Sequence, residues 1–149
     1  MSELLEKARS YEAKKIAATD KESKPLFHIS APAGWINDPN GFSVYNGKIH
    51  LFYQYYPYLR EWGPMHWGHS TTSDMIKWEQ LPCVLAPDEE YDKKGCFSGS
   101  AIEAVGKHVL VYTGVTRIKL PDGSEQERQN QCIAFGDGLN YMKHENKPV

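Results

Sequence analysis

The sequence has 149 residues, 40% hydrophobic and 24% charged, which excludes a disordered or collagen-like chain and is typical of a globular domain. Its formal net charge of −2 favours neutral partners over nucleic acids or anionic membrane surfaces, which require basic patches. The sequence lacks an apolar run long enough to span a bilayer, and its N-terminus is charged where a signal peptide is apolar, so we expect a cytoplasmic protein.

Residues 1–25 are predicted to form a helix and a linker. Apolar residues recur there at roughly helical spacing, namely at Leu4, Leu5, Ala8, Tyr11 and Ile16. Ser2 is suited to cap this helix, and the polar stretch from residue 19 to residue 25 ends it. We expect the helix to be an appendage of a domain formed by residues 26–149.

From Phe27 onward the sequence consists of short segments rich in β-branched and aromatic residues, separated by Gly, Asn, Asp and Pro. Residues 42–45 and 48–55 flank Asn46-Gly47, the pair best suited to a two-residue hairpin turn. Residues 66–72 and 78–82 follow as a third and a fourth strand. These segments predict one sheet of four strands.

The second half repeats this plan with strands over 99–102, 107–112 and 131–135 and a last one running through Tyr141. Equivalent residues are 58 to 63 positions apart, which predicts two units of about sixty residues, similar to the blades of a β-propeller. The alternative is a chance similarity of two antiparallel sheets. Two blades cannot close a ring, and residues 146–149 read like a connection to another unit.

The chain offers no recognisable metal or cofactor site. Cys83, Cys96 and Cys132 are odd in number and widely spaced, which favours buried thiols over a disulfide or a zinc site. His66 and His69 are three apart on a predicted strand, so their side chains point to opposite faces and belong to the core or to a pocket. We expect neither a metal nor a cofactor.

Twelve of the eighteen Phe, Trp and Tyr residues lie between Phe27 and Trp78. Such a cluster is explained equally well by a core and by a surface that stacks on sugar rings. We assign Trp67 and Trp78 to the core.

The segment Trp35-Ile36-Asn37-Asp38-Pro39-Asn40-Gly41 is the most informative part of the sequence. A lone Asp in a loop is usually a turn former, but Pro39 restricts Asp38 to extended geometry and a strand is expected to start at Gly41. Asn37 and Asn40 are expected to donate hydrogen bonds that keep the carboxylate ionised. A fixed carboxylate beside Trp35 suits a nucleophile that attacks the anomeric carbon of a sugar.

This segment resembles the nucleophile motif of glycoside hydrolase family 32, the β-fructofuranosidases. Further segments resemble the family's motifs in the same order: Phe52-Tyr53-Gln54-Tyr55-Tyr56-Pro57, residues 61–70, residues 74–79 and residues 95–101. The resemblance implies that Asp38 is the nucleophile and that the fructosyl unit is bound by Trp35, Ile36, Asn37, Asp38, Gln54, Trp62, Phe97 and Ser98.

The resemblance also implies an all-β fold, the first two blades of a five-bladed β-propeller, and retaining hydrolysis of sucrose, sucrose 6-phosphate or fructan. The family's acid/base Glu lies in a Glu-Cys pair and its stabilising Asp in Arg-Asp-Pro, and neither motif occurs in these 149 residues. We interpret Asp92 and Glu103 as solvated loop charges. The chain alone is therefore expected to be inactive and, with unclosed blades, to self-associate.

Several alternatives remain open from the sequence. A fructosyltransferase would use the same covalent intermediate, and a relative could act on another furanoside such as an arabinoside. A non-catalytic carbohydrate-binding propeller belongs to a different class, but binding alone requires no ionised carboxylate beneath the sugar.

Overall fold

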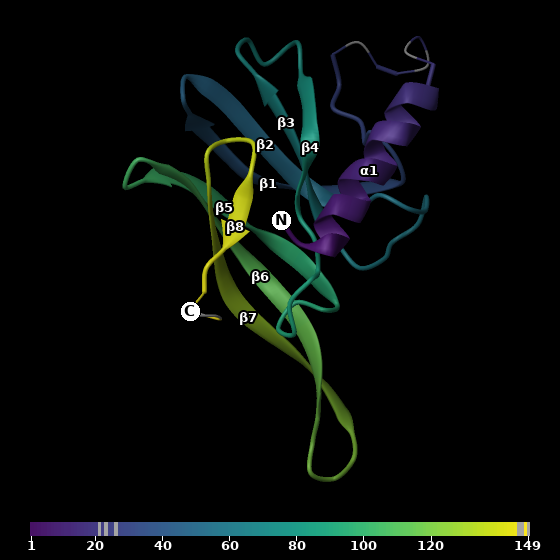
Figure 1. The fold of residues 1–149 in the computed structure, drawn as a ribbon, viewed down its shortest axis with the longest axis vertical. Helices are drawn as coiled ribbons and strands as arrows, with labels where there is room; N and C mark the ends of the chain where they lie inside the picture. Colours follow the sequence, from purple (N-terminus) through teal and green to yellow (C-terminus); the bar gives the residue numbers. More distant parts are fainter. Residues whose placement is uncertain (21, 23, 26, 146–147, 149) are drawn as a thin grey trace.

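The computed structural model describes residues 1–20, 22, 24–25, 27–145 and 148. In this part of the chain, one α-helix precedes two four-stranded antiparallel sheets, with strand orders β1-β2-β3-β4 and β5-β6-β7-β8. The sheets pack against each other with β1 next to β5 (Figure 1). This arrangement confirms the all-β fold and the predicted repeat, while the expected connection over residues 146–149 lies largely outside the described residues.

The first sheet consists of β1 (Trp35–Tyr45), β2 (Lys48–Tyr56), β3 (His66–Thr72) and β4 (Glu79–Leu85). Asn46 and Gly47 have φ angles of 50° and 71°, the positive values that a type I′ turn needs at both central positions. Strand β1 begins at Trp35 and not at Gly41 as predicted, because the residues around Asp38 already pair with β2. Pro39 is tolerated because β1 is an edge strand.

The second sheet consists of β5 (Gly95–Ala104), β6 (Lys107–Lys119), β7 (Glu125–Gly136) and β8 (Tyr141–Lys143). Strands β6 and β7 are much longer than predicted and pair continuously up to Lys119 and Glu125. Their distal halves project from the body as a two-stranded hairpin (Figure 1). The added residues of β7 are mostly exposed and polar, so hydrophobic alternation could not reveal them.

The core between the sheets is predominantly aromatic and aliphatic. Its buried members are Phe52, Trp67, Val84, Leu85, Cys96, Leu110, Tyr112, Cys132, Ala134 and Tyr141. All three cysteines are free and buried, as predicted. Trp67 is fully buried, whereas Trp78 is partly exposed.

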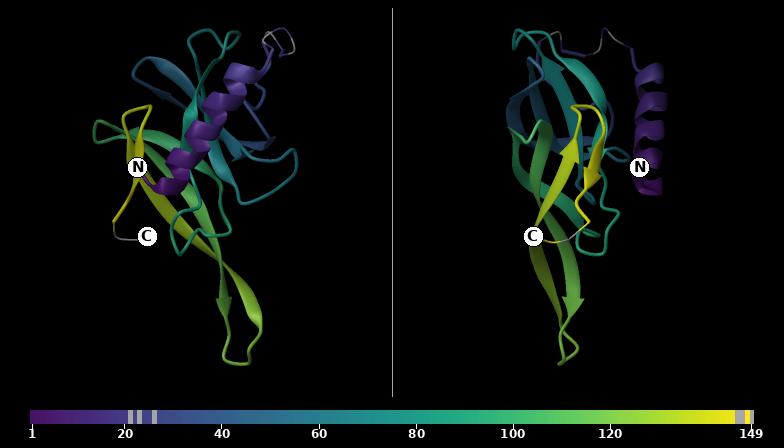
Figure 2. Two further views of the ribbon diagram at one scale, coloured as in Figure 1. Left: turned by 45° about the vertical axis from the view of Figure 1, so that its right-hand side comes forward. Right: turned by 60° about the vertical axis from the view of Figure 1, so that its left-hand side comes forward.

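Helix α1 (Glu3–Ala18) lies along the outer side of the first sheet (Figure 2). The Oγ atom of Ser2 accepts a hydrogen bond from the backbone N–H of Leu5 at 3.2 Å, which confirms the predicted cap. Leu5 and Ala8 are buried, but Leu4 and Ile16 are 44% and 42% exposed, so the predicted apolar face is only partly correct. Among the described residues, no helix is long and apolar enough to cross a membrane.

Two charged side chains attach α1 to strand β4, so the helix is not the appendage that the sequence suggested. The Nε atom of Arg9 donates a hydrogen bond to the Cys83 carbonyl at 2.7 Å, and the backbone N–H of Cys83 donates to Glu12 at 2.9 Å. These bonds cover backbone groups of an edge strand, and burial raises the pKa of Glu12 to about 7. The division into residues 1–25 and 26–149 stays a prediction.

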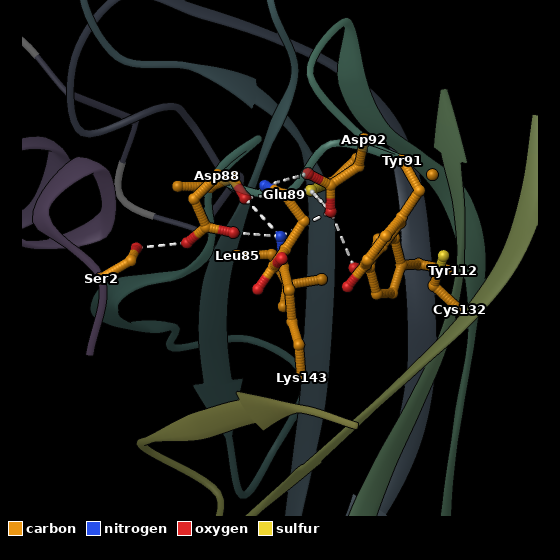
Figure 3. Close-up of polar contacts among 12 residues, drawn as sticks. Ser2, Leu85, Asp88, Glu89, Tyr91, Asp92, Tyr112, Cys132 and Lys143 are labelled. Carbon is orange, nitrogen blue, oxygen red and sulfur yellow. Dashed lines mark hydrogen bonds and ion pairs between the residues drawn. The ribbon is translucent and has the colours of Figure 1, made fainter. Parts of the chain in front are cut away.

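A buried ionic network links β8 to the β4–β5 connection (Figure 3). The ammonium group of Lys143 contacts Asp88 and lies 2.5 Å from Asp92 Oδ2, which also accepts a 2.9 Å hydrogen bond from the Tyr112 hydroxyl. Asp92 is fully buried, so its interpretation as a solvated loop charge was wrong, whereas Glu103 is exposed. Burial raises the pKa of Asp92, and Lys143 opposes this rise.

Three buried histidines lie between the sheets, at the end opposite to the start of β1. His50 Nδ1 is 2.9 Å from His69 Nε2, and the His50 ring packs edge-on against the His108 ring with centroids 4.8 Å apart. His108 in turn contacts the Tyr141 hydroxyl at 2.7 Å and the Ser43 hydroxyl at 2.9 Å. Burial lowers the pKa of all three histidines, that of His108 to about 4.

We expect His108 to make the chain less stable as the pH falls from about 6.5 towards 4. Histidine in the unfolded chain titrates near 6.5, whereas His108 stays neutral down to about 4, so the unfolded state binds more protons in this range. The associated free energy of unfolding is on the order of 3 kcal/mol, present at neutral pH and lost in acid.

Urea unfolding of the chain and of His108→Phe at several pH values tests this expectation. Glu12, whose raised pKa stabilises the fold below about 7, contributes equally to both proteins and cancels in their difference. The free energy of unfolding of His108→Phe should therefore decline less in acid than that of the parent. The exposed His28→Phe serves as the matched control, and equal pH dependence of parent and His108→Phe would contradict the assignment.

Candidate active site

Asp38 lies in a β-bulge of strand β1. Ile36 pairs with Tyr55 and Pro39 with Tyr53, so Asn37 and Asp38 together stand opposite the single residue Gln54. The Asp38 side chain is exposed, and the bulge presents it at the start of β1.

The residues around Asp38 do not hold it in the predicted way. The Trp35 indole N–H donates to Asn37 Oδ1 at 2.8 Å, which fixes the orientation of the Asn37 side chain. Asn40 is buried, and within the described residues its Nδ2 atom has no hydrogen-bond partner. Neither amide donates to Asp38 in the described part of the chain, which corrects the expectation from the sequence.

Strand β5 contains a matching irregularity next to β1. Phe97 pairs with Thr113 and Gly99 with Tyr112, so Ser98 is the extra residue of a bulge and is exposed. Both bulges lie near the starts of two neighbouring strands, one in each sheet. The fold therefore brings Asp38 and Ser98 to the same end of the sheet pair.

The start of β5 is fastened to the first sheet by buried hydrogen bonds. The Cys96 backbone N–H donates to the Met65 carbonyl at 2.8 Å, and Gln54 Nε2 donates to the Cys96 carbonyl at 2.9 Å. Gln54 is 2% exposed. The residue predicted to bind sugar thus also joins the two sheets directly beneath the Asp38 bulge.

The apolar residues predicted for the sugar pocket lie next to each other only in part. Trp62, in the β2–β3 loop, is 51% exposed and packs edge-on against Phe97 with ring centroids 6.1 Å apart. Ile36 instead packs against the core cluster that includes Leu5 and Tyr55. The structure therefore groups Trp62 with Phe97 and directs Ile36 towards the helix side.

Trp67 was assigned only to the core, yet its indole N–H donates to the Phe97 carbonyl at 3.1 Å. The sequence could have indicated a hydrogen bond from Trp67, because a buried tryptophan N–H usually has an acceptor. The partner could not be identified, since Trp67 and Phe97 are thirty positions apart in the sequence.

The two histidines of the third strand make separate contacts. His66 Nδ1 is 2.8 Å from the Pro64 carbonyl, whereas His69 contacts His50. Their separation agrees with the prediction of opposite faces. The described residues contain no group of three or more His, Cys, Asp and Glu that could hold a metal ion.

Comparison with known proteins identifies the family. The sequence model of the family "Glycosyl hydrolases family 32 N-terminal domain" matches residues 28–149. The chain belongs to glycoside hydrolase family 32. The two sheets are accordingly two blades of the propeller found in this family, as the resemblance of the motifs implied.

Individual family 32 relatives match this chain over most of its length. A sucrose-6-phosphate hydrolase of Escherichia coli is 48% identical over 120 residues, which are 80% of this chain and 25% of the relative. A levanase of Bacillus subtilis is 39% identical over 150 residues, which are 98% of this chain and 22% of the relative. The chain therefore spans about a quarter of the length of these curated relatives.

Solved structures of family 32 enzymes share the fold. A β-fructofuranosidase of Bombyx mori superposes with a TM-score of 0.83 at 45% identity, covering 96% of this chain and 30% of that one. A sucrose-6-phosphate hydrolase of Lactobacillus gasseri gives a TM-score of 0.73 at 34% identity, covering 95% and 27%.

Proposed function

We propose that this chain forms the N-terminal part of a retaining β-fructofuranosidase in which Asp38 is the nucleophile. The observation that carries the proposal is the pair of bulges that present Asp38 and Ser98 at the same end of neighbouring strands. Trp62 and Phe97 form an aromatic corner at that end, suited to the apolar face of a sugar. Trp35, Asn37 and Gln54 complete the proposed fructosyl site, whereas the Ile36 side chain packs towards the helix and is left out of it.

The proposed reaction proceeds in two steps. An Asp38 oxygen forms an ester bond to C2 of the fructosyl unit as the bond from C2 to the leaving oxygen breaks, and a carboxylic acid protonates that oxygen. Water, deprotonated by the same acid/base residue, then attacks C2 and releases fructose and the Asp38 carboxylate. We assign the acid/base residue to a part of the enzyme beyond these 149 residues, because they contain no Glu-Cys pair.

Sucrose or sucrose 6-phosphate is the proposed substrate. Relatives from Escherichia coli carry the names sucrose-6-phosphate hydrolase and raffinose invertase, and the Bacillus subtilis relative is a levanase. The carbohydrates in these names share a fructofuranosyl unit, which is the part that Asp38 would receive. Analysis of the products formed from sucrose distinguishes hydrolysis from fructosyl transfer and from binding alone. The cytoplasmic location stays a prediction.

Replacing Asp38 with Asn tests the nucleophile. A suitable protein is a hybrid enzyme, in which this chain replaces the matching N-terminal part of the Escherichia coli sucrose-6-phosphate hydrolase. Asp38→Asn should lower kcat on sucrose at least about 10³-fold, because the amide cannot form the ester. Glu103→Gln, an exposed carboxylate of β5, should leave kcat unchanged. Near-normal kcat in Asp38→Asn would remove Asp38 from the mechanism.

We expect Trp62 to contact the sugar without determining which bond is cleaved. In the hybrid enzyme, Trp62→Ala should weaken transition-state binding by roughly 1–3 kcal/mol, which lowers kcat/KM while the products stay the same. Trp62→Phe, which keeps an aromatic ring, should lose less. Identical steady-state kinetics of Trp62→Ala and the parent would place this side chain outside the pocket.

The 149-residue chain by itself should not release glucose from sucrose. It has no carboxylate in a recognisable acid/base motif, and protonation of the leaving oxygen is typically worth 10²–10⁴-fold. Size-exclusion chromatography should show self-association, because the outer faces of the two blades lack neighbouring blades. Robust turnover by a monodisperse monomer would refute both expectations.

A further inference from the structure

We propose that Trp67 is a positioning residue that sets the spacing between the strand of Asp38 and the strand of Ser98. The inference rests on the proposed function and adds to it a residue that does not touch the sugar. Trp67 lies in β3, within the first blade, and is fully buried.

One end of the Trp67 side chain fixes the start of β5. Its indole N–H donates to the Phe97 carbonyl at 3.1 Å, on the residue directly before the bulged Ser98. A bulged residue lacks a partner in the strand ladder, so its position depends on how its neighbours are held. The Trp67 bond supplies such a restraint on one side of Ser98.

The opposite part of the ring adjoins β1. A Cβ atom at Gly41 would lie 2.8 Å from the Phe52 ring, 3.1 Å from Ala101 Cβ and 3.4 Å from Trp67 Cζ3, so Gly41 leaves just enough room for these three side chains. Gly41 belongs to the same strand as Asp38 and has a φ of 52°, which favours glycine. Trp67 therefore lies beside the strand of Asp38 at Gly41 and is bonded to the strand of Ser98 at Phe97 through one rigid side chain.

The surroundings keep the Trp67 ring in a single orientation. The rings of Phe52 and Tyr112 pack around it with centroids 5.7 Å and 6.3 Å away. A phenylalanine at position 67 could fill part of this space, but it could not donate to the Phe97 carbonyl. Position 67 therefore requires both the bulk of the indole ring and its hydrogen bond to the Phe97 carbonyl.

The sharpest variant removes only the hydrogen bond. Trp67→3-benzothienylalanine keeps the bicyclic shape and replaces the N–H with sulfur, and Trp67→Phe is a second, encodable variant. Trp78→3-benzothienylalanine is the matched control, because Trp78 lies directly before β4 and its indole forms no hydrogen bond with the described residues.

The first measurement uses the chain itself. Amide NMR signals of Phe97 and Ser98 should shift and lose protection from hydrogen exchange in Trp67→3-benzothienylalanine, and should stay unchanged in the Trp78 control. Unchanged Phe97 and Ser98 signals in a folded Trp67 variant would overturn the proposal without any activity assay.

The second measurement is a double-mutant cycle in the hybrid enzyme. Trp67→3-benzothienylalanine should lower kcat/KM about fivefold to tenfold, the effect of losing one buried hydrogen bond. In a Ser98→Ala background the same exchange should cost less than about twofold, because Trp67 acts through Ser98. Equal losses in both backgrounds would show a merely structural role and overturn the proposal, whereas an active Asp38→Asn enzyme would refute the proposed function separately.

Discussion

The start of β5 is held against the first blade by buried hydrogen bonds, and the candidate sugar-binding residues depend on this junction. The Cys96 backbone bonds to Met65, the Gln54 amide reaches the Cys96 carbonyl, and the Trp67 indole reaches the Phe97 carbonyl. Each donor is removed from water, so leaving its acceptor unpaired would cost about 1–3 kcal/mol. These bonds therefore define one register between the blades, and with it the relation of Asp38 to Ser98.

The interface between the blades changes in character along its length. Near the starts of β1 and β5, backbone carbonyls receive hydrogen bonds from buried side chains, which positions exposed groups at the surface. The middle is an aromatic core around Trp67, and the opposite end holds the histidine cluster. This division leaves Asp38 and Ser98 exposed at the first end while the remainder of the interface supplies stability.

The hydrophobic pattern was sufficient for the blade repeat but not for the features that build the site. The Asn46-Gly47 turn and strand β3 matched the prediction because local propensity and burial agree there. The bulges at Asp38 and Ser98 arise from pairing with strands β2 and β6, and no local signal reports such a register. Asp92 was misassigned for the same reason, since its partner Lys143 is distant in the sequence. The family motifs supplied the candidate site residues, which stay a prediction, whereas the contacts of Gln54 and Trp67 at the junction needed the structure.

The most direct test of Asp38 as the nucleophile is to locate the sugar on the enzyme during turnover. The hybrid enzyme can be mixed with sucrose, quenched rapidly in acid and digested, and its peptides weighed by mass spectrometry. We predict one fructosyl unit on the peptide that contains Asp38, absent from Asp38→Asn. A fructosyl unit bound to a different carboxylate would contradict the assignment of Asp38.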